Sequence, residues 1–316
     1  MSGPEDTPDE FGQIERLFRP LTKGAPEAFG LLDDAAAIPS RPGQDLIVTK
    51  DAMVEGVHFL PSDPPDLVAR KLLRVNLSDL AAKGAEPYGY FLATAWPRSF
   101  EWEQRQRFAA GLTADGDLFG LTLLGGDTVS TPGPLSLSLT MLGWTPAGAM
   151  VRRGGARAGD LLMVSGTIGD GFLGLRAARG ELEDPDGYLA GRYRLPNPRL
   201  DLRAVLRASA SAAADVSDGL IADIGHIAKA SGLRADLDLD RIPLSAAAGA
   251  WSFAQPDLAA ALSALAAGGD DYEVVCTAPI PLEGFTVIGR MAEGVGVELA
   301  WRGEAQALGR SGWKHG

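Results

Sequence analysis

The sequence predicts a protein of two α/β domains. The chain has 316 residues, which is enough for two domains of ordinary size. Apolar segments typical of strands alternate with segments of helical periodicity through both halves of the chain. Between the halves lies the stretch TPAGAMVRRGGARAGD (residues 145–160), which is rich in Gly, Ala and Arg. We therefore expect domains at residues 29–145 and 146–316, preceded by a leader and a first helix at residues 1–28.

The first half shows a regular order of elements. Residues 1–10 are polar and acidic, which predicts a disordered leader. Phe11, Ile14 and Leu17 then recur at helical spacing and predict a short amphipathic helix. We expect strands at residues 46–48, 88–96, 121–124 and 135–143, and helices at residues 66–84 and 101–119. The third of these strands is expected to break at the Gly125-Gly126 pair.

The second half repeats the alternation of strands and helices. Strands are expected at residues 161–165, 235–239, 272–277 and 285–288. Helices are expected at residues 172–179, 198–208, 219–231 and 258–267. These elements predict a second α/β domain similar in size to the first.

Composition restricts the class of partner. Hydrophobic residues make up 46% of the chain and charged residues 22%, as in globular proteins with a buried core. The net charge of −12 argues against a nucleic-acid partner, because binding to phosphates requires a basic surface. The sequence has no signal-peptide pattern and no apolar stretch near the ~20 residues of a membrane span. With a single cysteine, Cys276, we expect a cytoplasmic protein with no membrane partner.

Common nucleotide-binding motifs are absent from the sequence. None of the six lysines precedes Ser or Thr, so there is no Walker A loop, and neither HRD nor DFG occurs. Gly169, Gly171 and Gly174 form a GxGxxG pattern between a predicted strand and a predicted helix. A dinucleotide site also needs a second parallel strand ending in an acidic residue, and none follows here. We interpret these glycines as a tight turn between strand and helix.

Aspartates stand at the ends of the apolar elements, beside small residues. Converging carboxylates repel one another and acquire raised pKa values unless cations bind them. Mg²⁺ prefers oxygen ligands and is commonly held by carboxylates together with substrate phosphates. Bound cations would also reconcile an acidic chain with a phosphorylated substrate. The pattern favours a magnesium–phosphate site over isolated turns and helix caps, and its members are Asp33, Asp34, Asp51, Asp79, Asp127, Asp215, Asp218, Asp270 and Asp271.

Several segments together resemble the thiamine-monophosphate kinase family. In chain order they are DDAA (33–36), VTKDAMVEGVHF (48–59), VNLSDLAAKGAEP (75–87), LLGGDT (123–128), SGTIGDG (165–171), ADVSDGLIADIGHIAKAS (214–231), GGDDYE (268–273) and GWK (312–314). The resemblance covers about residues 29–315. The wider superfamily includes aminoimidazole-ribonucleotide synthetase and selenophosphate synthetase. VEGVHF with NLSDLAA and VSDGL is similar to the thiamine branch, and the N-terminal cysteine of a selenophosphate synthetase is missing.

The resemblance implies a fold and an activity. The fold would be that of aminoimidazole-ribonucleotide synthetase, with two α/β domains and a homodimer in which the N-terminal sheets pair. The activity would be ATP-dependent phosphorylation of thiamine monophosphate to thiamine diphosphate, with release of ADP. Transfer would be direct and assisted by several Mg²⁺ ions, because phosphoryl transfer needs mainly positioning and charge neutralisation.

The resemblance also implies roles for individual residues. Positions matching the family's metal ligands are Asp34, Thr49, Lys50, Asp51, Asp79, Asp127, Asp215 and Asp218. Positions matching its ATP contacts are Gly126, Asp127, Arg153 and Ser217, and those matching its substrate contacts are His58, Asp270 and Trp313. Asp51 and Asp127 are the expected catalytic residues, holding Mg²⁺ together with Asp79.

The chain departs from the family pattern at three positions. Leu32 precedes the paired aspartates where glycine is usual. Lys50 replaces Ser or Thr, and since an ammonium group cannot bind Mg²⁺, only its backbone carbonyl could serve as a ligand. Asp270 replaces the usual Glu, so its carboxylate has a shorter reach.

Two alternative functions stay open at this point. One is another ATP-dependent synthetase of the same superfamily, acting on a different small phosphate. The other is a non-catalytic protein that binds magnesium and nucleotide and senses thiamine phosphate. A sensor would bind ATP without releasing ADP, so turnover distinguishes it from an enzyme.

Overall fold

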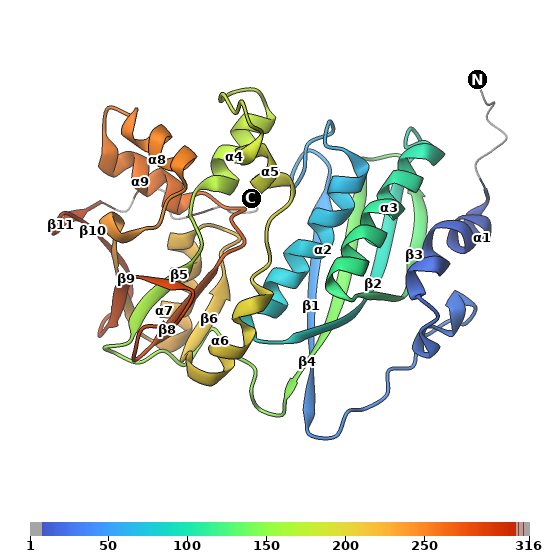
Figure 1. Cartoon of the computed structure of the whole chain (residues 1–316), viewed down its shortest axis with the longest axis horizontal. Coiled ribbons are helices and arrows are strands. Elements are labelled where there is room, and N and C mark those ends of the chain that lie inside the picture. The colour runs from blue at the N-terminus through green and yellow to red at the C-terminus, as the bar shows by residue number, and fades with distance from the viewer. Residues whose placement is uncertain (1–7, 308, 310–311, 313–316) are drawn as a thin grey trace. The chain divides into compact units, whose positions relative to one another are not determined.

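The computed structural model describes residues 8–307, 309 and 312, and divides into two compact units (Figure 1). The first comprises Met1–Leu80 and Glu86–Gly148, and the second comprises Ala81–Ala85 and Ala149–Gly316. Each unit combines helices with a β-sheet, which confirms the predicted α/β class. Within the described residues, no helix is both long and apolar enough to cross a lipid bilayer.

The first unit is built on a sheet with the strand order β1-β4-β2-β3. Its strands are β1 (Gln44–Val54), β2 (Glu86–Pro97), β3 (Thr122–Thr131) and β4 (Ser136–Pro146). Strand β4 pairs antiparallel with β1 and β2, whereas β2 and β3 are parallel. Helices α2 (Pro65–Ala82) and α3 (Trp102–Phe119) lie on one face of this sheet (Figure 1). Helix α3 provides the crossover that two consecutive parallel strands require.

Among the described residues, the other face of this sheet carries no α-helix, and at one end it is covered by Glu27 and Arg41, which contact Tyr88. Side chains alternate along β1, so that Ile47 and Met53 are buried while Val48 is 57% exposed. On β3, at the opposite edge, Val129 is 50% exposed. We call the face formed by Leu46, Val48, Ala52, Ala93 and Val129 the open face.

Strand β3 continues through the Gly125-Gly126 pair, so the predicted break there is wrong. A Cβ atom at Gly126 would lie 1.9 Å from the backbone oxygen of Leu92 on β2. The register of β2 against β3 also shifts at Tyr90 and Phe91, as at a β-bulge. The glycines therefore allow close approach of two strands, which explains why they do not end β3.

The N-terminal segment is helical but irregular. It contains α1 (Glu10–Gln13), the π-helical turn η1 (Ile14–Phe18), and the 3₁₀ turns η2 (Arg19–Thr22) and η3 (Pro26–Leu31). The predicted short helix is thus present, although its winding changes from α to π at Ile14 and to 3₁₀ at Arg19, next to Pro20, which has no N–H donor. Of the predicted disordered leader, residues 1–7 lie outside the described residues.

The second unit is built on a mixed sheet with the order β11-β10-β7-β9-β5-β8-β6. Its strands are β5 (Leu161–Ser165), β6 (Ala212–Asp215), β7 (Arg234–Asp238), β8 (Val274–Ala278), β9 (Phe285–Ala292), β10 (Gly296–Trp301) and β11 (Glu304–Gln306). Its helices are α4 (Asp170–Ala178), α5 (Tyr188–Arg194), α6 (Arg203–Ser209), α7 (Leu220–Ser231), α8 (Ala246–Phe253) and α9 (Leu258–Ala267), with the 3₁₀ turns η4 (Leu200–Leu202) and η5 (Leu239–Arg241).

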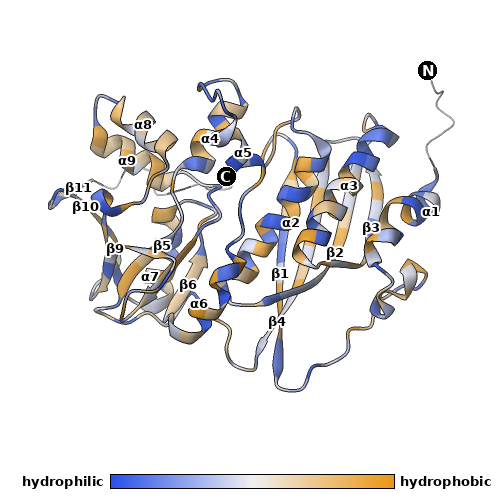
Figure 2. Ribbon diagram, in the orientation of Figure 1, coloured by the Kyte–Doolittle hydropathy of each residue, from blue (hydrophilic) through white to orange (hydrophobic). Residues whose placement is uncertain are grey.

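Two apolar clusters hold the second unit together. Ile224 and Ile227 of α7 pack with Leu162 and Val164 of β5 on one face of the sheet. Leu206 of α6 packs with a second cluster that includes Cys276. Helices α8 and α9 are hydrophobic over most of their length in Figure 2, and they pack against one another. The sheet is consequently buried on both sides where the loops of the candidate site begin.

Several helices and strands of the second unit were not predicted from the sequence. They are β6, α5, α8, β10 and β11. Strand β6 reads Ala-Ala-Ala-Asp, and alanine has a low preference for strands. All four residues are buried, so the strand forms through its pairing with β8 rather than through local propensity.

Candidate functional site

A cluster of oxygen ligands lies where β1 contacts α2. Thr49 and Asp51 are two residues apart on β1 and therefore point to the same side of the sheet. The Thr49 hydroxyl donates a hydrogen bond to Oδ2 of Asp79 on α2. All three side chains are partly buried. The Thr49 hydroxyl thus contacts the Asp79 carboxylate, and the Asp51 carboxylate lies within electrostatic reach of Asp79.

Asp51 has an unusual protonation equilibrium. Burial raises the pKa of its carboxyl to about 7, and the negative charge of Asp79 raises it further in the same direction. A carboxylate destabilised in this way is stabilised by a cation of matching size. The donor set of Thr49, Asp51 and Asp79 consists only of oxygen, as Mg²⁺ prefers. The residues therefore fit a magnesium ion.

Lys50 and His58 flank this cluster in different ways. Lys50 is exposed and, by the alternation of β1, points to the open face, away from Asp51. His58 accepts a hydrogen bond at Nδ1 from the backbone N–H of Val54, at 3.0 Å. Neutral His58 must therefore carry its ring proton on Nε2, which makes Nε2 a donor.

Asp127 lies apart from Asp51 within the chain. Strands β1 and β3 are the two edges of the sheet, three strand spacings or roughly 14 Å apart. The neighbouring Thr128 points inward, because its hydroxyl accepts a hydrogen bond from Nε1 of Trp96 at 2.8 Å. Asp127 is exposed and consequently points to the open face, next to Gly126. A single chain does not bring Asp127 to the Asp51–Asp79 pair.

The paired aspartates Asp33 and Asp34 are exposed, and Oδ1 of Asp33 accepts a hydrogen bond from the backbone of Asp34. Leu32, which replaces the usual glycine, has a φ of −109° that any residue adopts. The left-handed conformations fall on the residues before it, including Leu31 with a φ of 58°. The left-handed positions of this turn therefore precede Leu32, which needs no glycine-like conformation.

The second unit brings its candidate residues together on two adjacent loops. Asp215 is the buried last residue of β6, and Ser217 and Asp218 follow it in the loop before α7. The Ser217 carbonyl accepts a hydrogen bond from the backbone N–H of Asp270, at 3.0 Å. A Cβ at Gly269 would lie 2.4 Å from the same carbonyl. Only glycine therefore permits this contact between the two loops.

Buried acids anchor the loop that presents Asp270. Asp271 is 1% exposed and accepts hydrogen bonds from the backbone N–H groups of Gly169 and Gly171, at 2.8 and 2.9 Å. Glu273 is completely buried and pairs with Arg199. These contacts hold Asp270 in a left-handed conformation with a φ of 67°. The loop is thus fixed from within while Asp270 stays partly exposed.

The GxGxxG pattern has a packing role in the structure. Gly169 precedes α4 with a φ of 92°, and a Cβ at Gly174 would lie 2.2 Å from the Leu189 carbonyl of α5. The described chain continues from α4 into α5 and α6 without an intervening strand. The interpretation as a turn between strand and helix is confirmed, and no dinucleotide-binding unit is formed.

Asp223 on α7 is a functional candidate that the sequence argument missed. Its Oδ2 accepts hydrogen bonds from the backbone N–H groups of Ser217 and Asp218, at 3.1 and 3.2 Å. Burial raises the pKa of Asp223 to about 7, Asp218 adds to this, and Arg153 opposes it. Arg153 therefore lies within electrostatic reach of the same loop. The signal in the sequence was an aspartate at helical spacing among apolar residues such as Leu220, Ile224 and Ile227.

Trp313, the remaining expected substrate contact, lies outside the described residues.

Comparisons with known proteins assign the fold to a class. Residues 32–145 match the family described as AIR synthase related protein, N-terminal domain, and residues 157–308 match its C-terminal domain. The chain is thus an AIR synthase related protein.

Individual relatives narrow this class. The chain is 56% identical to a thiamine-monophosphate kinase of Caulobacter vibrioides, over 98% of this chain and 91% of the relative. It is 39% identical to the enzyme of Salmonella typhimurium, over 93% and 97%. The crystal structure of the thiamine-monophosphate kinase from Stenotrophomonas maltophilia K279a is 38% identical and superposes with a TM-score of 0.81, covering 94% of this chain and 98% of that one. The structure of AaThiL complexed with AMPPCP and TMP is 31% identical with a TM-score of 0.79, covering 91% and 96%. The chain belongs to the thiamine-monophosphate kinase family.

Proposed function

We propose that the protein transfers the γ-phosphoryl group of ATP to thiamine monophosphate, giving thiamine diphosphate and ADP. The observation that supports this most directly is the likeness, over nine-tenths of the chain, to AaThiL complexed with AMPPCP and TMP. AMPPCP is an analogue of ATP, and TMP is the abbreviation of thiamine monophosphate. The oxygen cluster of Thr49, Asp51 and Asp79 supplies the kind of site that two phosphorylated ligands require.

Magnesium is the proposed cation of this cluster. When bound, it would neutralise phosphate oxygens and hold them in line. Asp51 and Asp79 would provide its carboxylate ligands, and the burial that raises the pKa of Asp51 supports a compensating positive charge at this position. In the second unit, Asp215 and Asp218 are proposed to hold further ions. No general base is needed, because the acceptor phosphate oxygen is already ionised.

The remaining residues are proposed to bind and orient the substrates. Arg153 can form paired hydrogen bonds with phosphate oxygens, and Ser217 lies on the loop that Asp223 fixes. His58 would donate a hydrogen bond from Nε2 to thiamine monophosphate, since Nδ1 is engaged by Val54. Asp270, fixed by the buried acids beside it, would contact the same substrate.

We further propose a homodimer that pairs through the open face. Val48 and Val129 are 57% and 50% exposed apolar side chains on the sheet face that carries no α-helix among the described residues. Asp127 also points to this face, three strands away from Asp51. Asp51 and Asp79 lie on the opposite side of the sheet, so a second copy paired on the open face would bring its own Asp127 to them around the β1 edge. Each active site would then use residues of both subunits.

The activity is tested by incubating the purified protein with ATP, Mg²⁺ and thiamine monophosphate. We expect thiamine diphosphate and ADP in equal amounts, separated by chromatography. Thiamine and aminoimidazole ribonucleotide serve as control acceptors and should give no phosphorylated product. Binding of ATP and thiamine monophosphate without ADP release would contradict the proposal and favour a sensor. Turnover with the ribonucleotide alone would favour another synthetase of the superfamily.

A further inference from the structure

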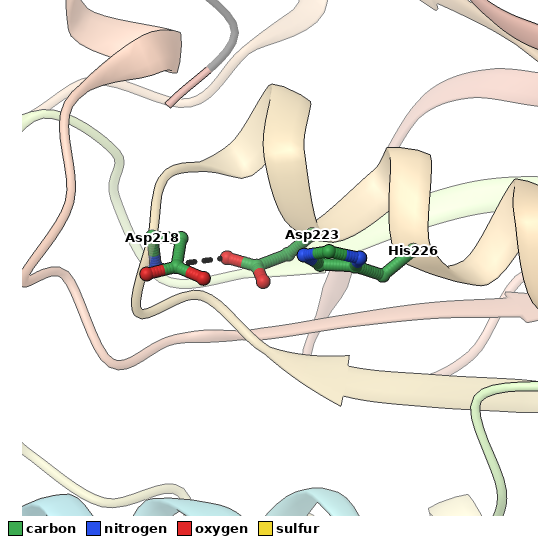
Figure 3. Close-up of side chains that lie close together, drawn as sticks. All are labelled: Asp218, Asp223 and His226. Carbon is green, nitrogen blue, oxygen red and sulfur yellow. Dashed lines mark hydrogen bonds between the residues drawn. The ribbon is translucent and has the colours of Figure 1, made fainter. Parts of the chain in front are cut away.

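Three ligand-bearing side chains converge at the start of α7. Asp218 lies in the preceding loop, and Asp223 and His226 lie one helical turn apart on α7 (Figure 3). One ligand atom from each of these side chains lies within 4.8 Å of the other two. Asp218 is partly buried, Asp223 is buried and His226 is exposed, so the group runs from the interior to the surface.

The carboxylate of Asp223 has one oxygen that the fold does not use. Oδ2 accepts both backbone N–H groups of the loop, which satisfies a capping role. Oδ1 has no hydrogen-bond partner within the described part of the chain. Asp223 is 0% exposed, so bulk solvent does not reach this oxygen. An unpaired buried carboxylate oxygen is costly unless a ligand contacts it. In Figure 3 the carboxylate lies between the Asp218 carboxylate and the His226 ring.

We infer that Asp218, Asp223 and His226 form a binding site for one divalent transition-metal ion, completed by water. Two ligand atoms of a tetrahedral ion at 2.0–2.2 Å lie about 3.3–3.6 Å apart. The three ligand atoms here lie within 4.8 Å of one another, so binding needs each separation to close by at most about 1.5 Å, and rotation of the exposed His226 side chain supplies part of this. The inference extends the proposed metal role of Asp218 and adds two ligands to it.

The imidazole determines which ion the site prefers. Histidine suits Zn²⁺, Cu²⁺ and Ni²⁺ much better than Mg²⁺, which prefers oxygen ligands alone. This distinguishes the site from the cluster of Thr49, Asp51 and Asp79, which contains only oxygen. An ion held here would lie beside Ser217 and Arg153, on the loop proposed to contact ATP. The chain would thus hold two chemically different kinds of cation site.

The test observes the histidine rings of the full-length protein directly. The chain has three histidines, His58, His226 and His315, so a long-range ¹H–¹⁵N spectrum resolves each imidazole. We expect one equivalent of Zn²⁺ to shift the coordinating ring nitrogen of His226 and to leave the other two rings as references. Millimolar Mg²⁺ should leave the His226 resonances in place. His226 resonances that do not move with Zn²⁺ would overturn the inference.

Variants identify the other ligands. His226→Asn and Asp223→Asn should each weaken Zn²⁺ binding at least about tenfold in a chelator competition, whereas His315→Asn, the matched control, should have no effect. Asparagine keeps an oxygen that accepts the N–H groups of Ser217 and Asp218, so Asp223→Asn is expected to fold. Unchanged Zn²⁺ affinity in both variants would show that Asp223 has only a capping role. These measurements use no nucleotide, so they stand or fall separately from the kinase assay with Mg²⁺.

Discussion

Asp51 lies inside strand β1, and its charged neighbour Asp79 lies on helix α2. The prediction that Asp51 follows the end of a short strand at residues 46–48 is wrong, because β1 extends from Gln44 to Val54 and contains Asp51. Burial against α2 raises its pKa to about 7, above the 3.8 of an exposed aspartate. Between pH 4 and 7 the folded protein therefore keeps a proton that the unfolded chain releases. The free energy of unfolding must fall as the pH rises through this window.

Asp51→Asn should remove this pH dependence. In metal-free buffer with a chelator, we expect the variant to gain stability over the wild type as the pH rises from 4.5 to 8. One proton contributes a slope of at most about 1.4 kcal/mol per pH unit. Other buried acids, such as Asp223, contribute equally to the wild type and the variant. The difference between their unfolding free energies in urea therefore reports the contribution of Asp51 alone. A stability difference that is the same at both pH values would contradict the assignment.

Asp127→Asn should abolish turnover and leave the fold intact. The side chain is exposed on the open face, so unfolding free energy should change by less than about 0.5 kcal/mol. Loss of a charged metal ligand should lower kcat about a thousandfold or more. Glu103→Gln, which removes an exposed charge from α3 of the same unit, is the matched control and should keep full activity. Near-normal kcat in Asp127→Asn would place the metal site elsewhere.

Individual residues were predictable from sequence only where a motif contained them. Asp51, Asp79 and Asp127 belong to recognisable segments, but the sequence does not state which of them meet. Asp223 was missed because one acid on an apolar helix resembles an ordinary surface residue until its burial is known. Its two hydrogen bonds to the loop became visible only in three dimensions.

Strand β3 shows how an element can contradict its local sequence. Two consecutive glycines are normally a signal for a turn, yet the strand passes through them. The two positions differ sharply in their surroundings. A Cβ at Gly126 would meet the Leu92 backbone oxygen at 1.9 Å, whereas a Cβ at Gly125 would meet the Phe91 ring at 3.1 Å. Backbone cannot move aside as a side chain can.

Substituting each glycine tests this difference. Gly126→Ala should lower the unfolding free energy by about 1–3 kcal/mol, because β2 and β3 must separate to admit the methyl group. Gly125→Ala, the matched control, should change it by much less, since the Phe91 ring can shift and alanine restricts the unfolded chain. Urea unfolding of both variants measures the effect. Equal destabilisation would mean that the strands are not in close contact at Gly126.

Elements with strong periodicity were predicted well, and those without it were not. Helix α9 has the bounds expected from its apolar pattern, and α2 and α3 agree within a few residues. Strand β6, with three alanines, has no such pattern and exists because β8 pairs with it. Boundaries set by tertiary contacts, such as the extension of β3 to Thr131, are beyond what local propensity encodes.

At the scale of the whole molecule, strand order decides which residues meet. The order β1-β4-β2-β3 arises from pairings between distant segments, and no local pattern specifies it. It places Asp51 and Asp127 at opposite edges and on opposite faces of one sheet. The proposal that both hold Mg²⁺ with Asp79 therefore needs the Asp127 of a second copy, reaching the pair around the β1 edge of the sheet. The exposed apolar residues of the open face give that subunit a surface to bind.

Mixing two inactive variants tests the shared site. In a two-fold dimer that combines Asp51→Asn with Asp127→Asn chains, one site receives both substitutions and the other receives neither. Random exchange of subunits makes half of the dimers mixed, so activity should recover to about one quarter of the wild type. Sites built within single chains would instead carry one substitution each, and the mixture would stay inactive. Mixing either variant with itself is the control, and sedimentation at the assay concentration verifies the dimer. Recovery after refolding the variants together, and not after mixing them folded, would further show that exchange requires dissociation of the open faces.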